Sequence, residues 1–229
     1  KEKIQAWLSS PVMLLVYRLL TTLLALSISR WMLYLFNIQF FHQLDLRQAA
    51  SLYFNGMRFD LPIVFAINLP TIVFYCLPSR LIYNKGLQAF VDIVYVIANA
   101  LAILLNFLDI ICFHFFGKHL TVDFIKLLSQ SDEVSFGEVG HVFFDYWYLL
   151  VIFVLFVLII RVVAQQTQIN PPKKEEDPRW HLKQAISMVV MLVLTVIAGR
   201  GGLQAEPITV ETAMQYSDPQ NAPILLNTP

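Results

Sequence analysis

Long apolar blocks, separated by short polar stretches, dominate the sequence. A helix needs roughly 20 mostly apolar residues to cross a hydrocarbon core of about 30 Å, and five blocks meet that length. They are too long and too continuous for the alternating strands of a membrane β-barrel. The pattern predicts an all-α membrane protein, a bundle of five transmembrane helices, with spans near residues 11–36, 59–77, 87–116, 146–164 and 182–198.

Two of the connections between the blocks contain shorter amphipathic patterns. Apolar residues recur there at helical spacing, which is typical of short helices that lie on a membrane surface. These residues are Leu46, Ala49, Ala50 and Tyr53 in the first connection, and Leu120, Phe124, Leu127 and Leu128 in the third. The connection at 168–178 is polar and broken by prolines, so we expect a linker there.

The distribution of lysine and arginine predicts the orientation, because basic loops tend to stay on the cytoplasmic side. Basic residues precede the first span, lie in the second connection and surround the fourth, whereas the third connection is mainly acidic. The basic residues are Lys1, Lys3, Arg80, Lys85, Arg161, Lys173, Lys174, Arg179 and Lys183. We therefore expect a cytoplasmic N-terminus, a membrane domain over 1–198 and an extracytoplasmic segment over 199–229.

The composition agrees with a membrane location. The 229 residues are 57% hydrophobic and 14% charged, with a mean hydropathy of +0.62, whereas soluble domains have about 25% charged residues. The formal net charge is zero, so nothing favours nucleic acid as a partner. Cys76 and Cys112 fall at opposite depths of the predicted bundle, so we expect no disulfide between them.

Four polar residues share one face of the third block. Asp92, Asn99 and Asn106 recur every seventh residue, and Asp109 follows about one helical turn later. Polar and ionisable groups inside a membrane are costly and usually face a partner, a cavity or a site. We expect Asp92 to lie near the cytoplasmic end, where Arg18 of the first block can pair with it.

A second polar group is expected near the outer end. Arg30, Arg58 and Asp60 would gather there with Asn106 and Asp109. Arg58 and Asp60 point to different sides of a helix, so Arg58 is expected to reach Asp109. Two interpretations stay open. The group either orients the helices, or it forms a pocket in which Arg30 or Arg58 binds lipid phosphate while the other three orient the arginines.

The remaining polar residues form no catalytic or metal-binding pattern. His114 and His119 are five residues apart, so they do not stack on one helix face. Structural zinc sites need dense clusters of Cys and His. The sequence has no glycine-rich phosphate loop and no nucleophile elbow. We assign no catalytic residue, no metal ligand and no cofactor to this chain.

Several short motifs follow a definite order relative to the spans. They are GMRFD at 56–60, NFLD at 106–109, KHLTVD at 118–123, RGGLQ at 200–204 with Pro207, and NAPILLNTP at 221–229. In this order, and with five spans, they resemble the N-terminal membrane region of the lipoteichoic acid synthase and phosphoglycerol transferase family. This family belongs to the bacterial members of the alkaline phosphatase and sulfatase superfamily. The resemblance covers essentially the whole chain but only part of a family member.

The resemblance implies an anchor in the bacterial plasma membrane for an extracytoplasmic catalytic domain, with 221–229 leading into that domain. In family enzymes the domain uses a divalent metal (Mn, Mg or Zn) and a threonine nucleophile to transfer a phosphoglycerol-type group from a lipid such as phosphatidylglycerol. None of those residues is matched here, so we expect the chain to be part of a longer protein. The implied partners are membrane lipids and that catalytic domain.

Alternatives to this function stay open. The full-length protein would be a transferase or a sulfatase-like hydrolase, and the anchor would either present the lipid donor or serve a purely structural role. A small transporter or channel that uses the Asp/Asn stripe of the third span is a further alternative. The sequence has no internal repeat, and prolines interrupt only the second block, at Pro62 and Pro70. Transporters usually contain symmetric pairs of broken spans, which favours the anchor.

Overall fold

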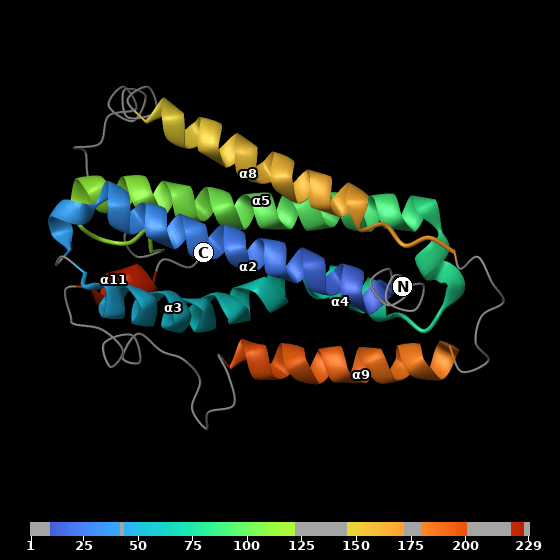
Figure 1. The fold of residues 1–229 in the computed structure, drawn as a ribbon. Coiled ribbons are helices and arrows are strands. Elements are labelled where there is room, and N and C mark those ends of the chain that lie inside the picture. Colours follow the sequence, from blue (N-terminus) through green and yellow to red (C-terminus); the bar gives the residue numbers. More distant parts are fainter. Residues whose placement is uncertain (1–9, 42–43, 122–145, 172–179, 201–220, 227–229) are drawn as a thin grey trace.

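The computed structural model describes residues 10–41, 44–121, 146–171, 180–200 and 221–226, and all regular structure among them is helical. This confirms the all-helical prediction. Four of the five long helices, α2 (Pro11–Phe36), α5 (Lys85–Phe116), α8 (Trp147–Gln166) and α9 (Trp180–Gly199), lie roughly along one axis (Figure 1). The fifth long helix is α3 (Leu46–Ile67). The short helices are η1 (Ile38–Phe40), α4 (Leu69–Cys76), η2 (Arg80–Tyr83) and α11 (Ala222–Leu225).

Four helices, α2, α5, α8 and α9, are each long and apolar enough to cross a membrane. The bent pair α3 and α4 makes a fifth candidate if the two are counted as one span. α2 has the predicted bounds, and the other three begin and end within two residues of theirs. In the most apolar 18-residue stretch of α8, and likewise of α9, only 17% of the residues are buried. Such large apolar faces, open to the surroundings, are compatible with a membrane protein.

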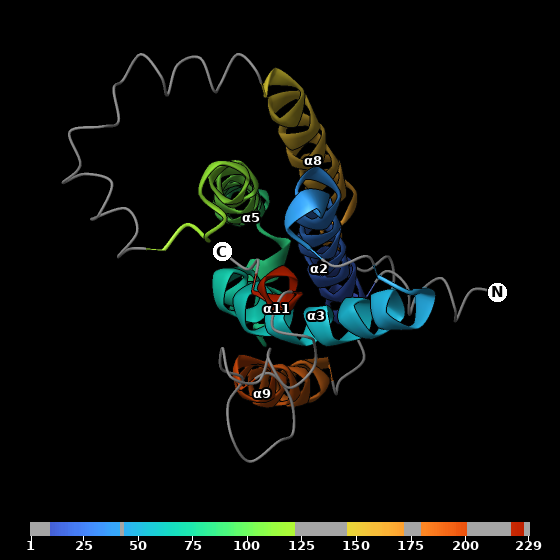
Figure 2. The ribbon, with the colours of Figure 1, turned by 90° about the vertical axis from the view of Figure 1, so that its left-hand side faces the viewer.

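The second block differs from its prediction. Instead of a separate surface helix followed by a span over 59–77, one helix runs from Leu46 to Ile67, and the chain then bends by 66° into α4. Pro70 lies in the first turn of α4. It has no backbone N–H, so the hydrogen-bond ladder of α3 cannot continue through it. α3 lies obliquely across the bundle (Figure 2).

Other predicted elements fall on parts of the chain that the structure does not describe. Of the surface helix expected over 120–128, only Leu120 and Thr121 lie among the described residues. The segments 172–179 and 201–220 lie outside them as well.

The two ends of the bundle are named here after the arginines of α2. At the Arg18 end, α2 begins, α4 ends, α5 begins and α8 ends; at the Arg30 end, α2 ends, α3 begins and α5 ends (Figure 1). α2 packs against α3, α4, α5 and α8, while α9 packs against α3 and α4. α8 and α9 therefore lie on opposite flanks, with α2 between them. α11 packs against α3 and α2 at the Arg30 end.

Local sequence sets the helix ends. Ser10 caps α2, and the Asn84 side chain accepts hydrogen bonds from the backbone N–H groups of Gly86 and Leu87 at 2.9 and 3.2 Å, which fixes the start of α5. Gly117 ends α5 in a left-handed conformation with φ of 60°. Glycine adopts that conformation without strain.

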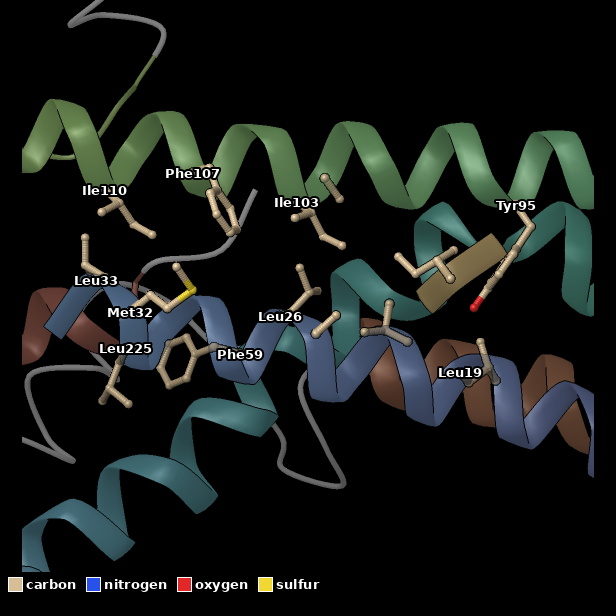
Figure 3. Close-up of a cluster of buried hydrophobic side chains, with 14 of the residues drawn as sticks. Leu19, Leu26, Met32, Leu33, Phe59, Tyr95, Ile103, Phe107, Ile110 and Leu225 are labelled. Carbon is tan, nitrogen blue, oxygen red and sulfur yellow. The ribbon is translucent and has the colours of Figure 1, made fainter. Parts of the chain in front are cut away.

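The core lies between α2 and its neighbours. Figure 3 shows Leu26 and Leu33 of α2 pointing toward Ile103 and Ile110 of α5, and all four side chains are at most 1% exposed. Between helices surrounded by lipid, burial adds little hydrophobic driving force, because the lipid is as apolar as leucine. Close packing and polar bonds between helices then decide how a bundle is held together.

The break between α3 and α4 is bonded to the middle of the bundle. Asn99 Nδ2 donates to Asn68 Oδ1 at 2.9 Å, and Asn68 Nδ2 donates back to Asn99 Oδ1 at 3.3 Å. Thr22 Oγ1 donates to the same Asn99 oxygen at 2.8 Å. All three residues are at most 1% exposed. The amide pair thus ties the bend to both α5 and α2.

We expect Asn99→Leu to lower the free energy of unfolding by about 2 kcal/mol, because it leaves the buried Asn68 amide without its partner. Thermal unfolding in detergent measures the loss. Asn55→Leu makes the same change on a less buried face of α3 and should have little effect. Equal stability of the wild type and Asn99→Leu would contradict a structural role for the amide pair.

Candidate functional site

Arg18 is fully buried and connects three helices. Its Nη2 donates to Asp92 Oδ1 of α5 at 2.6 Å and to the Ala164 carbonyl of α8 at 2.8 Å. Its Nε donates to Thr167 Oγ1, just after α8, at 2.7 Å. The structure therefore brings together the two residues that the sequence places at one depth, Arg18 and Asp92, in an ion pair. Hydrogen bonds between charged groups are roughly twice as strong as neutral ones.

Two tyrosine rings enclose the Arg18 guanidinium. The ring centroids of Tyr75 in α4 and Tyr95 in α5 lie 4.7 and 5.0 Å from its central carbon, within the range of cation–π attraction. Tyr75 donates to the Thr167 carbonyl at 2.8 Å, and Gln184 of α9 donates to the Tyr75 carbonyl at 2.6 Å. Side chains or backbone from α4, α5 and α8 thus surround the positive charge on α2, and α9 is joined to this cluster through Tyr75.

Arg30 of α2 and Asp60 of α3 form a second buried ion pair at the opposite end. The contact is bidentate, with Nη1 2.8 Å from Oδ2 and Nη2 2.5 Å from Oδ1. The Arg30 side chain is 3% exposed and that of Asp60 0%. Ser27 donates to the same carboxylate at 3.4 Å. Removing one partner of such a pair leaves an uncompensated buried charge, which costs about 3–5 kcal/mol.

Gly56 provides the space that this pair occupies. It precedes Asp60 by one helical turn, so both lie on the face of α3 that meets Arg30. A Cβ atom at position 56 would lie only 2.9 Å from Arg30 Cζ and closer still to Nη1. The first and last residues of the GMRFD motif therefore both position Arg30: Gly56 leaves space for the guanidinium, and Asp60 neutralises its charge.

The polar face of α5 (Asp92, Asn99, Asn106 and Asp109, called the α5 stripe below) has partners other than arginine in its half near the Arg30 end. Asn106 Nδ2 donates to Ser29 Oγ of α2 at 2.7 Å. Asp109 Oδ2 lies 2.7 Å from His119 Nδ1, and Oδ1 accepts from the Leu120 backbone N–H at 2.5 Å. Asn106 thus joins α5 to α2, while Asp109 holds the segment that follows α5.

Asp109 has partners other than Arg58, the residue that the sequence predicts for it. Gly117 follows the last residue of α5, and its left-handed conformation turns the chain so that His119 and Leu120 return to the Asp109 carboxylate. Arg58 is half-buried on α3 and lies in the sequence between Gly56 and Asp60, the two residues that position Arg30. Since the Arg30 guanidinium is buried against Asp60, Arg58 is the more accessible of the two arginines expected to meet lipid phosphate.

Within the described parts of the chain, no group of three or more His, Cys, Asp or Glu side chains is placed to hold a metal ion. His114 Nδ1 contacts Asn37 Oδ1 at 3.2 Å, and His119 contacts Asp109, so the two histidines have separate structural partners. Cys76 and Cys112 are free thiols.

Together these features define a class of protein: a helical bundle whose apolar helices are compatible with a membrane location. The chain is all-helical in its described part, has four or five segments fit to cross a membrane, and pairs both buried arginines with aspartates of other helices. Comparison with protein-family models, curated proteins and solved structures finds no match for this chain.

We expect Gly56→Ala to lower the free energy of unfolding by about 1–3 kcal/mol, because the added methyl group displaces the Arg30 guanidinium from its pocket. Gly199→Ala is the matched control, since nothing lies within 4 Å of its Cβ position. It should be neutral or slightly stabilising, because alanine favours helix. Chemical or thermal unfolding in detergent compares the two variants. If both retain wild-type stability, the space at Gly56 has no structural importance.

Proposed function

We propose that this chain is the membrane domain of an extracytoplasmic phosphoglycerol transferase, or of a related phospho-group transferase, in the sulfatase-like superfamily. In this proposal it anchors the catalytic domain in the bacterial plasma membrane and presents the lipid donor to that domain. The order of the five motifs supports the family, and the membrane-length helices support the anchor. The chemistry and its divalent metal belong to the catalytic domain.

One observation carries the anchor proposal: every polar member of the α5 stripe is bonded within the protein. A transport pathway would use such groups to face water or cargo. In this bundle they join helices or hold the segment after α5, which supports an anchor over a transporter or channel. The bonds run from Asp92 to Arg18, from Asn99 to Asn68 and Thr22, from Asn106 to Ser29, and from Asp109 to His119 and Leu120.

Basic residues support the proposed orientation. They gather at the Arg18 end, where α4, α5, α8 and α9 begin or end, and that end is cytoplasmic in our proposal. The residues concerned are Arg80, Lys85, Arg161 and Lys183. The Arg30 end then faces the outside, with the GMRFD motif close to it.

The packing of α11 supports a catalytic domain attached at the Arg30 end of the bundle. Ile224 and Leu225 are at most 1% exposed and pack against α2 and α3 at the Arg30 end. Figure 3 shows Leu225 beside Met32 and Phe59. In our proposal α11 attaches the extracytoplasmic part of the chain to the bundle at the same end as Arg58.

Arg58 is the residue that we assign to the donor phosphate. Guanidinium groups match phosphate oxygens in bidentate geometry, and Arg58 lies at the proposed outer end. Arg30 keeps a structural role with Asp60, and Asn106 and Asp109 also serve structure. Arg58 is therefore the one arginine of this group that we expect to act on the lipid.

The full-length enzyme with Arg58→Gln should release diacylglycerol from phosphatidylglycerol about tenfold more slowly in proteoliposomes, since one charge-assisted contact to phosphate is lost. Arg58 also has a partner within the protein, so the thermal unfolding of the variant is measured together with its turnover. Arg47→Gln, an exposed arginine on the same helix, should leave turnover unchanged.

Three results would count against the proposal in different ways. Unchanged turnover in Arg58→Gln would remove the lipid contact, and a parallel loss of stability would make Arg58 structural. A wild-type protein without phospho-group transfer or hydrolysis from any phospholipid would overturn the proposed function itself.

A further inference from the structure

An open groove of about 380 Å³ lies between α5 and α8 at the Arg18 end. It is at the opposite end of the bundle from the GMRFD motif, so it is distinct from the proposed donor contact. Asp92 and two isoleucines line it from α5, and Arg161 and Gln165 line it from α8. The groove therefore combines a polar part with an apolar part.

The polar part has free hydrogen-bonding capacity. Arg161 and Gln165 are exposed, lie one helical turn apart, and make no hydrogen bond or ion pair to any residue that the structure describes. Asp92 is already neutralised by Arg18 at 2.6 Å and also accepts from Gln168 at 3.2 Å. The lining thus has one unbalanced positive charge, that of Arg161.

The apolar part continues along α5. Ile93 and Ile97 lie one turn apart toward the middle of the helix and are 57% and 54% exposed. Arg161 lies five residues before the end of α8, about 8 Å along the helix axis. A long arginine side chain at that depth reaches the headgroup level of a bilayer. A ligand that fits this groove has a negative head next to Arg161 and a hydrocarbon chain beside the isoleucines.

We propose that the groove binds one anionic phospholipid from the leaflet at the Arg18 end. Its phosphate contacts the Arg161 guanidinium, its head oxygens accept from Gln165, and one acyl chain lies along Ile93 and Ile97. The single positive charge favours a headgroup with net negative charge over a zwitterionic one, because the cation of the latter would meet Arg161. This site does not rest on the transferase assignment.

Native mass spectrometry of the full chain tests the proposal. The protein is mixed in detergent with equal amounts of phosphatidylglycerol and phosphatidylcholine of the same acyl chains. We expect it to retain one phosphatidylglycerol, preferred about tenfold, and Arg161→Gln to lose that preference. Arg80→Gln removes another exposed arginine at the same end, outside the groove, and this variant should keep the preference for phosphatidylglycerol. Equal retention of the two lipids, or an unchanged preference in Arg161→Gln, would overturn the site.

A second pair of variants tests the acyl chain. Ile97→Trp adds bulk inside the groove, and Leu101→Trp adds the same bulk one turn further along α5, outside it. The two positions are 54% and 55% exposed, so neither change should disturb folding, and unfolding temperatures check this. Ile97→Trp should reduce phosphatidylglycerol retention several-fold, and Leu101→Trp should not. Equal retention by both variants, or equally tight binding of glycerol phosphate alone, would overturn the assignment to a lipid.

Discussion

The buried charge of Arg18 is the constraint on which the arrangement of the helices depends. Neither an apolar core nor lipid solvates a guanidinium, so its partners must lie at fixed positions when the bundle forms. Asp92 supplies the opposite charge, and the chain after α8 supplies a hydroxyl and a carbonyl oxygen. Two tyrosine rings cover the remaining faces. Satisfying one charge therefore fixes α2, α4, α5 and α8 relative to one another.

At two further positions along α2, a buried polar side chain is again bonded to other helices. Thr22 meets the amide pair of Asn68 and Asn99 near the middle, and Arg30 meets Asp60 near the other end. At the bend between α3 and α4, the buried side-chain amide of Asn68 finds its partner in Asn99 of α5. α8 and α9 contribute few buried side chains of their own, so their outer faces stay available to lipid.

Much of this arrangement is visible in the sequence. The seven-residue spacing on α5 predicts a polar face, and matching depths predict that Arg18 meets Asp92. The spacing cannot predict that Gly117 turns the chain back, so Asp109 meets His119 rather than Arg58. Gly56 acts by having no side chain, which no pattern of polar residues indicates. Pro70 marks a break in the second span, but its direction depends on Asn68 and Asn99, 31 residues apart.

A double-mutant cycle on Arg18 and Asp92 tests the central constraint most directly. Unfolding in detergent is measured for Arg18→Met, Asp92→Asn and the double variant, with Lys183→Met as an exposed control. If the Arg18–Asp92 pair fixes the bundle, Asp92→Asn, which leaves the buried Arg18 charge uncompensated, loses about 3–5 kcal/mol. Arg18→Met loses more than about 1 kcal/mol, and the control stays near the wild type. The double variant should then recover at least about 1 kcal/mol relative to the sum of the single losses. Strictly additive losses of unfolding free energy, or single losses below about 1 kcal/mol, would contradict the claim that this pair fixes the bundle.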